Sequence, residues 1–564
     1  MYKHLLLATI ALFINLSVFG QKEGTQDYHP PLGIPLVLSS NFGELRPNHF
    51  HMGLDFKTNL KTGYRLYAIE EGYVSRIKVS PYGYGKVVYI DHPNGITSVY
   101  AHCSVFKGKV DSIVRANQQR EQNFEVEIFP KKDEIKVKKG EVFALSGNTG
   151  GSTAPHLHFE LRDTKTEHAL NPLLFGFDIA DHKAPEIRGV KVYALSKDGY
   201  RFPERDRFKR VVKGKYGYFI GEDRLTIPSD FCSKAGGIGF SFDVIDRLDG
   251  ASNQCGLYGS ILIVAGDTIF GQETKRVPFE STRYVNSHKD FEEYALARKK
   301  YHKSFRTREN DLPIYISDED LGIIKANPGE LKQVKFIAYD VKGNRSELSF
   351  ELKIEDGPIN NMTDIPVGTD HLHPLETFAY NSDDRSLEFG VTTVYEPINL
   401  EKEELDHQIA DGNEPVHRAY KIKVRSLEGQ DGKSYIEITT KLNKKRALKT
   451  VYEDGWLIAE SKYFGSYEVV RDINPPRILP VNTTKSTTIF SKEKLIWNIS
   501  DTESGLADYN LFIDGQWYLT EYEYKGNILT FDIPENFEGT KELILKVTDE
   551  CGNTKEWVKT ITFK

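Results

Sequence analysis

Cysteine is scarce in this sequence, with four residues in a chain of 564. Cys103, Cys232, Cys255 and Cys551 show no Cys-x-x-Cys spacing, so a thiolate zinc site is not expected. Cys232 and Cys255 could pair in an oxidising compartment, and the sequence leaves that open. So few cysteines also exclude a small scaffold held together by many disulfides.

The chain also lacks an excess of positive charge. Its 74 Lys and Arg residues stand against 81 Asp and Glu residues, which gives a formal net charge of −7. No basic cluster interleaved with aromatic residues is present. We therefore expect no nucleic-acid partner, because binding to a phosphate backbone depends on clustered Lys and Arg.

Long hydrophobic runs are absent except at the start of the chain. The segment MYKHLLLATIALFINLSVFGQ has Lys3, then an apolar run, then the small residue Gly20, which is typical of a secretory signal peptide. The run is shorter than the ~20 residues of a spanning helix, and Asn15 and Ser17 interrupt it. An uncleaved membrane anchor is the alternative. We expect residues 1–20 to be a signal peptide and the exported protein to have no transmembrane segment.

What the sequence does contain favours β structure. It has 45 Gly, 24 Pro, 30 Tyr and 32 Phe, a composition that suits strands joined by many turns. Residues 36–178 form a dense run of short alternating strands. Further on, FDVIDRLDG, FIAYDVKGN and LKVTDECGN repeat the order strand, Asp, turn with Gly or Asn. This signature predicts β-sandwich modules of the immunoglobulin-like kind.

The length suggests three or four domains at roughly 150 residues each. The segments DIADHKAPEI and INPPRI are predicted linkers, and SHKDFEEYALARKKYHKSF, near 287–305, looks helical and amphipathic. We predict an N-terminal domain (36–178), module 2 (184–356, a β-sandwich with this helical insertion), module 3 (360–474, a β module) and module 4 (475–564, immunoglobulin-like).

The motif PHLHFEL carries two histidines on one predicted strand. Because side chains alternate along a strand, His156, His158 and Glu160 share one face, and Leu157 and Phe159 share the other. The apolar face should enter a core and leave the histidines on a surface or in a cleft. A plain polar strand face explains this motif as well as a metal site does.

The motif NHFHMGLDF brings an imidazole and a carboxylate together. His51 and Asp55 are four residues apart, and Asp55 begins on the polar face of a strand. An open catalytic zinc site needs a third protein ligand, which one histidine of the PHLHFEL motif could supply. His49 is then spare, and we expect it to lie on the surface or behind the ligands.

The motif VYAHCS ends a predicted hairpin that turns at HPNG. Alternation places Tyr100 and His102 on one face, where His102 could orient a water molecule near a metal or simply end the strand. Cys103 then points into the core, so it is not expected to act as a nucleophile.

A third histidine pair, His371 and His373, is predicted to have no metal role. Pro374 follows directly, and proline cannot donate to a β ladder, so a central strand is not expected there.

Together HMGLD, VYAHCS and STAPHLHFEL resemble the lysostaphin-like, LytM-type zinc metallopeptidases. The resemblance covers residues 36–178, and the sequences NFGELRPNHFHMGLDFKT and VSRIKVSPYGYGK resemble the version in exported proteins of Bacteroidetes-type bacteria. It implies a β peptidase domain of the barrel-sandwich or duplicated hybrid type. The chain departs from compact members in a polar insertion at 104–139, either a surface excursion or a lid, which leaves groove shape and substrate preference open.

The resemblance also implies roles for individual residues. It implies one zinc ion held by His51, Asp55 and His158, with His102 and His156 as catalytic residues that do not bind the metal. Activity would then be hydrolysis of peptide cross-links in bacterial peptidoglycan by zinc-activated water.

Arg46, Tyr100 and Asn148 are weaker candidates for contacting substrate, and a surface salt bridge is the alternative for Arg46. We expect the protein in the periplasm or cell envelope, or secreted. The β modules are candidate contacts for other cell-envelope proteins. The alternative function is a catalytically silent or protein-directed cell-wall scaffold or activator that uses these modules for binding.

Overall fold

The computed structural model describes most of the chain; the predicted signal peptide (1–20) and Cys232, whose pairing with Cys255 the sequence leaves open, lie outside the described residues. The described residues are 27–221, 223–231, 236–325, 327–359, 370–410, 414–427, 431–482, 488–489 and 493–564. Within them, no helix is both long and apolar enough to cross a membrane.

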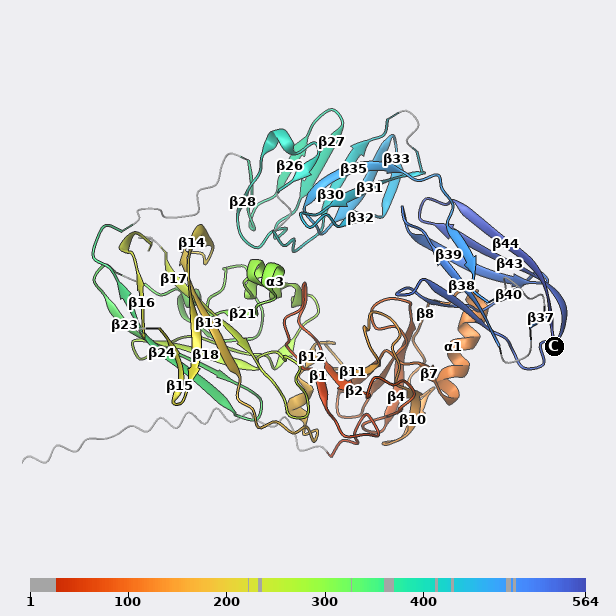
Figure 1. Cartoon of the computed structure of the whole chain (residues 1–564), viewed down its shortest axis with the longest axis horizontal. Coiled ribbons are helices and arrows are strands. Elements are labelled where there is room, and N and C mark those ends of the chain that lie inside the picture. Colours follow the sequence, from red (N-terminus) through yellow and green to blue (C-terminus); the bar gives the residue numbers. More distant parts are fainter. Residues whose placement is uncertain are drawn as a thin grey trace, which may run out of the picture.

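The fold is mainly β, as predicted, and its parts are arranged in a ring. Figure 1 shows the N-terminal domain in red to orange, module 2 in yellow to green, module 3 in cyan and module 4 in blue. Module 4 returns to the N-terminal domain beside helix α1 (Gly108–Glu121) and strand β8 (Val126–Ile128). The first and last parts of the described chain are therefore neighbours.

The main sheet of the N-terminal domain has the order β1-β2-β11-β6-β5-β4-β8. Its strands are β1 (Leu38–Ser40), β2 (Leu54–Lys57), β11 (His156–Asp163), β6 (Ile96–Ala101), β5 (Val87–Asp91) and β4 (Gly72–Val79), with β8 at the edge and β9 (Lys136–Val137), β12 (Ala169–Leu170) and β20 (Arg276–Val277) attached. A smaller sheet contains β3 (Arg65–Tyr67), β10 (Val142–Leu145) and β7 (Val105–Phe106). The predicted hairpin is confirmed, because β5 and β6 pair antiparallel across the HPNG turn.

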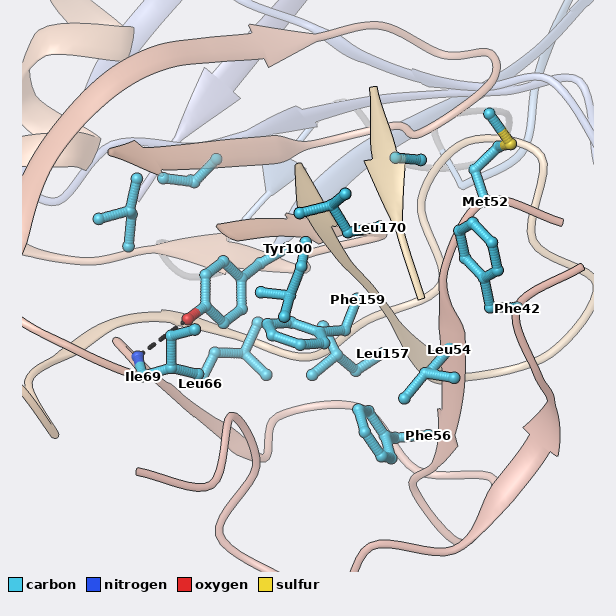
Figure 2. Close-up of a cluster of buried hydrophobic side chains, with 14 of the residues drawn as sticks. Phe42, Met52, Leu54, Phe56, Leu66, Ile69, Tyr100, Leu157, Phe159 and Leu170 are labelled. Atoms are coloured by element: carbon cyan, nitrogen blue, oxygen red, sulfur yellow. Dashed lines mark hydrogen bonds between the residues drawn. The ribbon is translucent and has the colours of Figure 1, made fainter. Parts of the chain in front are cut away.

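The apolar face of β11 lies in the core, as predicted. Leu157 and Phe159 are fully buried and pack with Leu54 and Phe56 of β2, as Figure 2 shows. Burying such side chains contributes about 1.5–3 kcal/mol each. This packing fixes which face of β11 the histidines occupy.

The polar segment 104–139 contains a helix that the sequence analysis did not predict. Helix α1 buries Val110, Val114 and Gln118 and contacts β7 and β8. Most of its remaining surface is polar, which hides the helical period in the sequence. The segment covers this flank of the domain.

Module 2 is built on one large sheet and shares a core with the N-terminal domain. The strands are β13 (Glu186–Leu195), β14 (Arg201–Gly214), β15 (Gly217–Ile220), β16 (Arg224–Ile227), β17 (Gly237–Ile245), β18 (Gly259–Val264), β19 (Asp267–Glu273), β21 (Tyr301–Lys303), β22 (Tyr315–Asp318), β23 (Leu331–Tyr339) and β24 (Arg345–Ile354). Tyr258, Val277 and Leu312 join the hydrophobic cluster of the N-terminal domain, and β20 pairs with β12. The two parts are packed as one unit.

The helical insertion is shorter than the sequence suggested. It consists of α2 (Val285–His288) and α3 (Phe291–Ala297), and the chain leaves the helix at Arg298, where φ is 55°. Residues 301–303 form β21, which pairs with β17. The prediction of a helix to residue 305 is therefore wrong at its end, because pairing with a buried strand overrides the local amphipathic pattern.

Modules 3 and 4 each enclose a hydrophobic cluster between two sheets. Module 3 contains β26 (Phe378–Asn381), β27 (Arg385–Phe389), β30 (Tyr420–Arg425), β33 (Thr450–Glu453) and β34 (Trp456–Ser461), against β29 (Gln408–Ile409), β31 (Ser434–Thr439), β32 (Lys445–Ala447) and β35 (Gly465–Arg471), plus β25 (His371–Leu372) and β28 (Ile398–Asn399). Module 4 contains β36 (Arg477–Pro480), β38 (Lys494–Ser500), β41 (Glu521–Glu523) and β42 (Ile528–Asp532), against β37 (Thr488–Ile489), β39 (Leu506–Ile513), β40 (Gln516–Tyr518), β43 (Gly539–Asp549) and β44 (Thr554–Phe563). An immunoglobulin-like topology stays a prediction.

Candidate active site

Three of the predicted site residues converge on one point. His51 Nε2 lies 3.0 Å from Asp55 Oδ1 and 3.1 Å from His158 Nδ1, and His158 Nδ1 lies 2.9 Å from Asp55 Oδ1. Ligands bound tetrahedrally to one zinc ion at about 2.1 Å are roughly 3.4 Å apart. The three atoms therefore have the mutual spacing that a small divalent ion requires.

Strand register produces this convergence. Asp55 of β2 lies directly opposite His158 of β11, and His51 comes from the loop that leads into β2. Gly53 lets that loop pass close to β11, since a Cβ there would lie 2.5 Å from the Phe159 carbonyl oxygen and 3.0 Å from His158 Cε1. Any larger residue at position 53 would push the loop and His51 away.

The outer nitrogens of both histidines are already engaged. His51 Nδ1 donates to the Asn41 carbonyl oxygen at 2.8 Å, and His158 Nε2 donates to Glu160 Oε1 at 2.8 Å. When each ring is neutral, its single N–H is the one used in these outer hydrogen bonds. The other nitrogen of each ring, His51 Nε2 or His158 Nδ1, is then an acceptor that faces the Asp55 carboxylate. Three acceptors with no proton between them favour a cation, so this donor set fits a metal ion such as zinc.

Module 2 supports the metal-binding side of the site. Asn41 Nδ2 donates to the Gly256 carbonyl oxygen at 2.9 Å, and the Gly256 amide donates to Asn41 Oδ1 at 2.7 Å. The buried ammonium of Lys289 donates to the carbonyl oxygens of Arg46 and Pro47 at 2.6 and 3.0 Å. The loop that carries His51 is thus held by hydrogen bonds from outside its own domain.

Glu160 is a functional candidate to which the sequence analysis gave no role. It is completely buried and accepts from His158, from Arg162 Nε at 2.7 Å and from the Tyr84 hydroxyl. Burial alone would raise the pKa of Glu160, but the Arg162 guanidinium and His158 lower that pKa to about 2. The signal was present in the sequence, because Glu160 shares the strand face of His158.

The electrostatics of the three convergent residues favour positive charge. Burial acts to raise the pKa of Asp55, but the neighbouring imidazoles of His51, His156 and His158 hold that pKa well below its usual value. Burial acts to lower the pKa of His158, but Asp55 and Glu160 raise it to about 9. A proton and a metal ion would compete for the same nitrogen atom, so metal binding there should release protons.

His102 and His156 lie beside the three residues. Their ring centroids are 4.8 Å apart, and His156 Nε2 is 3.4 Å from Asp55 Oδ1. His102 Nδ1 donates to the Thr149 carbonyl oxygen at 2.8 Å, and His156 Nδ1 donates to the Ala154 carbonyl oxygen at 2.8 Å. Each neutral ring is therefore left with an acceptor at Nε2.

His102 and Tyr100 do not share a face, contrary to the prediction from alternation along β6. The register of β6 with β11 puts Tyr100 opposite Phe159 on the core side, and the Tyr100 hydroxyl accepts from the Ile69 amide at 3.1 Å (Figure 2). His102 reaches the other histidines because β6 ends at Ala101 and the φ of His102 is 60°. Tyr100 is completely buried, which removes it as a surface for substrate.

The other substrate candidates lie at the rim. The Arg46 guanidinium donates to Ser40 Oγ at 2.8 Å and lies 3.7 Å from Asp55 Oδ2. Asn148 Oδ1 accepts from Ser152 Oγ at 2.7 Å in the turn before β11. His49 is exposed and outside the convergent group.

The remaining candidates lie apart from the site. His371 and His373 are in module 3, where β25 is a two-residue strand that pairs only with β28 among the described strands. Cys103 is fully buried, as predicted, and burial raises the pKa of its thiol to about 12.

Two further groups of three carboxylates, each with oxygens within 4.8 Å of one another, contain aspartates of the recurring turn signature. They are Asp181, Asp246 and Asp340, and Asp472, Asp501 and Asp549.

Comparison with known proteins agrees with this site. Residues 49–119 match the model of Peptidase family M23, which includes His51, Asp55 and His102 and stops before β11. The N-terminal domain therefore contains a match to Peptidase family M23, and the predicted resemblance is confirmed at that level.

Three relatives each match 22–23% of the chain. An uncharacterized metalloprotease of Haemophilus influenzae is 35% identical over 131 residues, 23% of this chain and 21% of the relative. The DD-carboxypeptidase/endopeptidase Mpg of Neisseria meningitidis serogroup B is 35% identical over 136 residues, 23% of this chain and 25% of the relative. The peptidoglycan DD-endopeptidase ShyA of Vibrio cholerae is 32% identical over 130 residues, 22% of this chain and 24% of the relative. The chain thus spans about a quarter of the length of these relatives.

Proposed function

We propose that the N-terminal domain is a zinc-dependent endopeptidase that hydrolyses peptide cross-links of bacterial peptidoglycan. The observation that carries this proposal is the convergence of His51, Asp55 and His158, with His102 and His156 beside them. The family match supports peptide hydrolysis, and a relative named as a peptidoglycan DD-endopeptidase supports the substrate class. In a Gram-negative wall the proposed bond is a D,D-peptide link between stem peptides.

In this proposal His51 Nε2, Asp55 Oδ1 and His158 Nδ1 hold the zinc ion. Three protein ligands are the usual number in a catalytic zinc site. When bound, such an ion lowers the pKa of a water molecule toward ~7 and polarises a carbonyl group. Asn41 and Glu160 orient the two imidazoles through their outer nitrogens.

His102 and His156 would move protons. Burial, together with nearby His158 and His156, lowers the pKa of His102 to about 3, so its ring is neutral at neutral pH. Either ring can accept the proton of the attacking water at Nε2, and the imidazolium formed in that way can then hydrogen-bond the developing oxyanion or pass the same proton to the leaving amine. Their Nδ1 bonds to backbone carbonyls fix the tautomer that this chemistry needs.

We also propose that the protein acts outside the cytoplasmic membrane, in the periplasm or cell envelope or as a secreted protein. Its proposed substrate is found there, and the sequence predicts a signal peptide at residues 1–20.

The test is digestion of purified peptidoglycan followed by mass analysis of the fragments. We expect new amine and carboxyl ends within the cross-links, loss of this activity with a chelator, and recovery when zinc is added. A zinc-loaded protein that releases no fragments would contradict the proposal and favour the scaffold alternative.

A further inference from the structure

Module 4 touches the turn that precedes β11. The ammonium of Lys525 donates to the carbonyl oxygens of Asn148 and Ser152 at 2.6 and 2.9 Å. Glu521 accepts from Lys86 Nζ through both carboxylate oxygens at 2.9 Å. Lys525 is more than 370 positions away from the turn in sequence, yet it bonds to both ends of the turn.

The same turn holds both of the histidines proposed to move protons. Within residues 148–152, the Thr149 carbonyl oxygen accepts from His102 Nδ1, and Ser152 Oγ lies 3.0 Å from His156 Nδ1. Lys86 joins the two sets of contacts, because its amide donates to Thr149 Oγ1 at 3.0 Å while its ammonium binds Glu521. A shift of this turn would move both imidazoles.

We propose that Lys525 and Glu521 of module 4 are positioning residues for His102 and His156. This inference rests on the proposed function, because it assigns module 4 a part in the same reaction. Lys525 ties the two ends of the turn together with charge-assisted hydrogen bonds, which are roughly twice as strong as neutral ones. The active site is thereby completed by the last module of the chain.

The contacts favour positioning over blocking of the site. Within the described part of the chain, the hydrogen bonds and ion pairs of module 4 with the N-terminal domain reach backbone carbonyls and Lys86. None of them reaches the side chains of His51, Asp55 or His158. The ring contact of Tyr524 with Tyr82, at 5.0 Å, also lies beside the turn.

Hydrogen bonds from two different modules hold the two sides of the active site, and this difference makes the inference testable. Module 2 holds the side that carries His51, through Asn41 and Gly256. Module 4 holds the side that carries His102 and His156. Loss of the module 4 contacts should therefore slow turnover and leave metal binding intact.

The experiment compares Lys525→Met with Lys541→Met in the full-length protein. Both lysines lie in module 4 with side chains 26% exposed, but Lys541 pairs with Asp514 in its own module. For Lys525→Met we expect kcat on a soluble cross-linked muropeptide to fall about 10- to 100-fold, with KM and zinc content unchanged. Lys541→Met should match the wild type, and Lys525→Arg should recover part of kcat.

Hydrogen exchange gives a readout that does not depend on activity. In Lys525→Met we expect faster exchange of the backbone amides at 147–153 and unchanged exchange in β43 and β44. Unchanged exchange at the turn, or a kcat equal to or above the wild-type value, would overturn the positioning role. If the wild type is inactive but the turn loosens in Lys525→Met, the proposed function fails and the positioning of the turn stands.

Discussion

Replacing Glu160 by glutamine removes one negative charge from the best-buried part of the site. The carboxylate accepts from His158 Nε2, from the Arg162 guanidinium and from the Tyr84 hydroxyl, all within the N-terminal domain. An amide keeps one oxygen but turns an NH₂ group toward one of these donors. Glu160→Gln therefore leaves the Arg162 guanidinium buried without its carboxylate.

The loss of stability in Glu160→Gln can be calculated in two ways. The fall in the pKa of Glu160 from 4.5 to about 2 corresponds to about 3 kcal/mol of stability, present above pH 4.5 and lost as the pH falls toward 2. Removing one partner of a buried ion pair costs about 3–5 kcal/mol. We expect the free energy of unfolding of the unit formed by the N-terminal domain and module 2 to fall by about 3 kcal/mol at pH 7. Zinc affinity should fall about 10- to 100-fold, because an uncharged amide holds His158 Nε2 more weakly than the carboxylate does.

The double variant Glu160→Gln/Arg162→Met separates these two effects. It also removes the unpaired guanidinium, so stability should partly recover while zinc affinity stays low. Glu167→Gln is the control, because Glu167 is exposed and lies 3.9 Å from the Arg162 guanidinium, so its loss should change the free energy of unfolding by less than about 1 kcal/mol.

Unfolding has to be followed by hydrogen exchange or calorimetry. The four tryptophans, Trp456, Trp497, Trp517 and Trp557, all lie in modules 3 and 4, so their fluorescence does not report on the N-terminal domain. Zinc affinity can be measured by competition with a chelator. Wild-type zinc affinity in Glu160→Gln would refute the reasoning that this carboxylate orients His158.

Two further predictions concern groups away from the site. His371→Ala and His373→Ala should leave the zinc content unchanged, as measured by metal analysis, because both residues lie in module 3; loss of zinc in either would contradict the assigned site. Burial, followed by the charge of Asp181, raises the pKa of Asp246 to about 8. The folded protein then keeps a proton that the unfolded chain releases near pH 4, so stability falls as the pH rises from about 4 to about 8. In metal-free buffer, Asp246→Asn should raise the free energy of unfolding by about 1–3 kcal/mol at pH 8 and have little effect at pH 4, whereas the exposed control Asp267→Asn should change neither. Equal effects of Asp246→Asn at both pH values would contradict this assignment.

Sequence reasoning was most successful where local pattern and burial agree. The faces of β11 follow from alternation, because Leu157 and Phe159 must enter the core and leave His158 on the other side. The register of β11 with β2 then brings His158 opposite Asp55. The fold class and the face of β11 that carries the histidines could therefore be anticipated. The choice of His158 over His156 as the third convergent residue came from the family resemblance, because spacing alone left it open.

Sequence reasoning was unsuccessful where the backbone departs from regular geometry. The φ of His102 is positive, so its side chain does not follow the alternation of β6, and Tyr100 goes to the core instead. That conformation is fixed by the Thr149 carbonyl oxygen, which is distant in sequence. The alternation of side chains along β6 therefore contains no information about this contact.

The contacts between modules were also beyond sequence reasoning. Nothing near Lys525 or Asn148 marks them as partners, since each lies in an ordinary polar turn. Likewise, Gly256 and Asn41 meet only because module 2 and the N-terminal domain share a core. Through these long-range contacts, residues of module 2 can affect the side of the site that carries His51. Residues of module 4 can affect the side that carries His102 and His156.

The most direct test of the central claim is metal analysis of two purified variants that differ by two positions on one strand, His158→Ala and His156→Ala. The wild type should contain one zinc ion per chain, His158→Ala should contain none, and His156→Ala should retain the ion while losing activity. A His156→Ala protein without zinc, or a His158→Ala protein that keeps it, would contradict the assigned site.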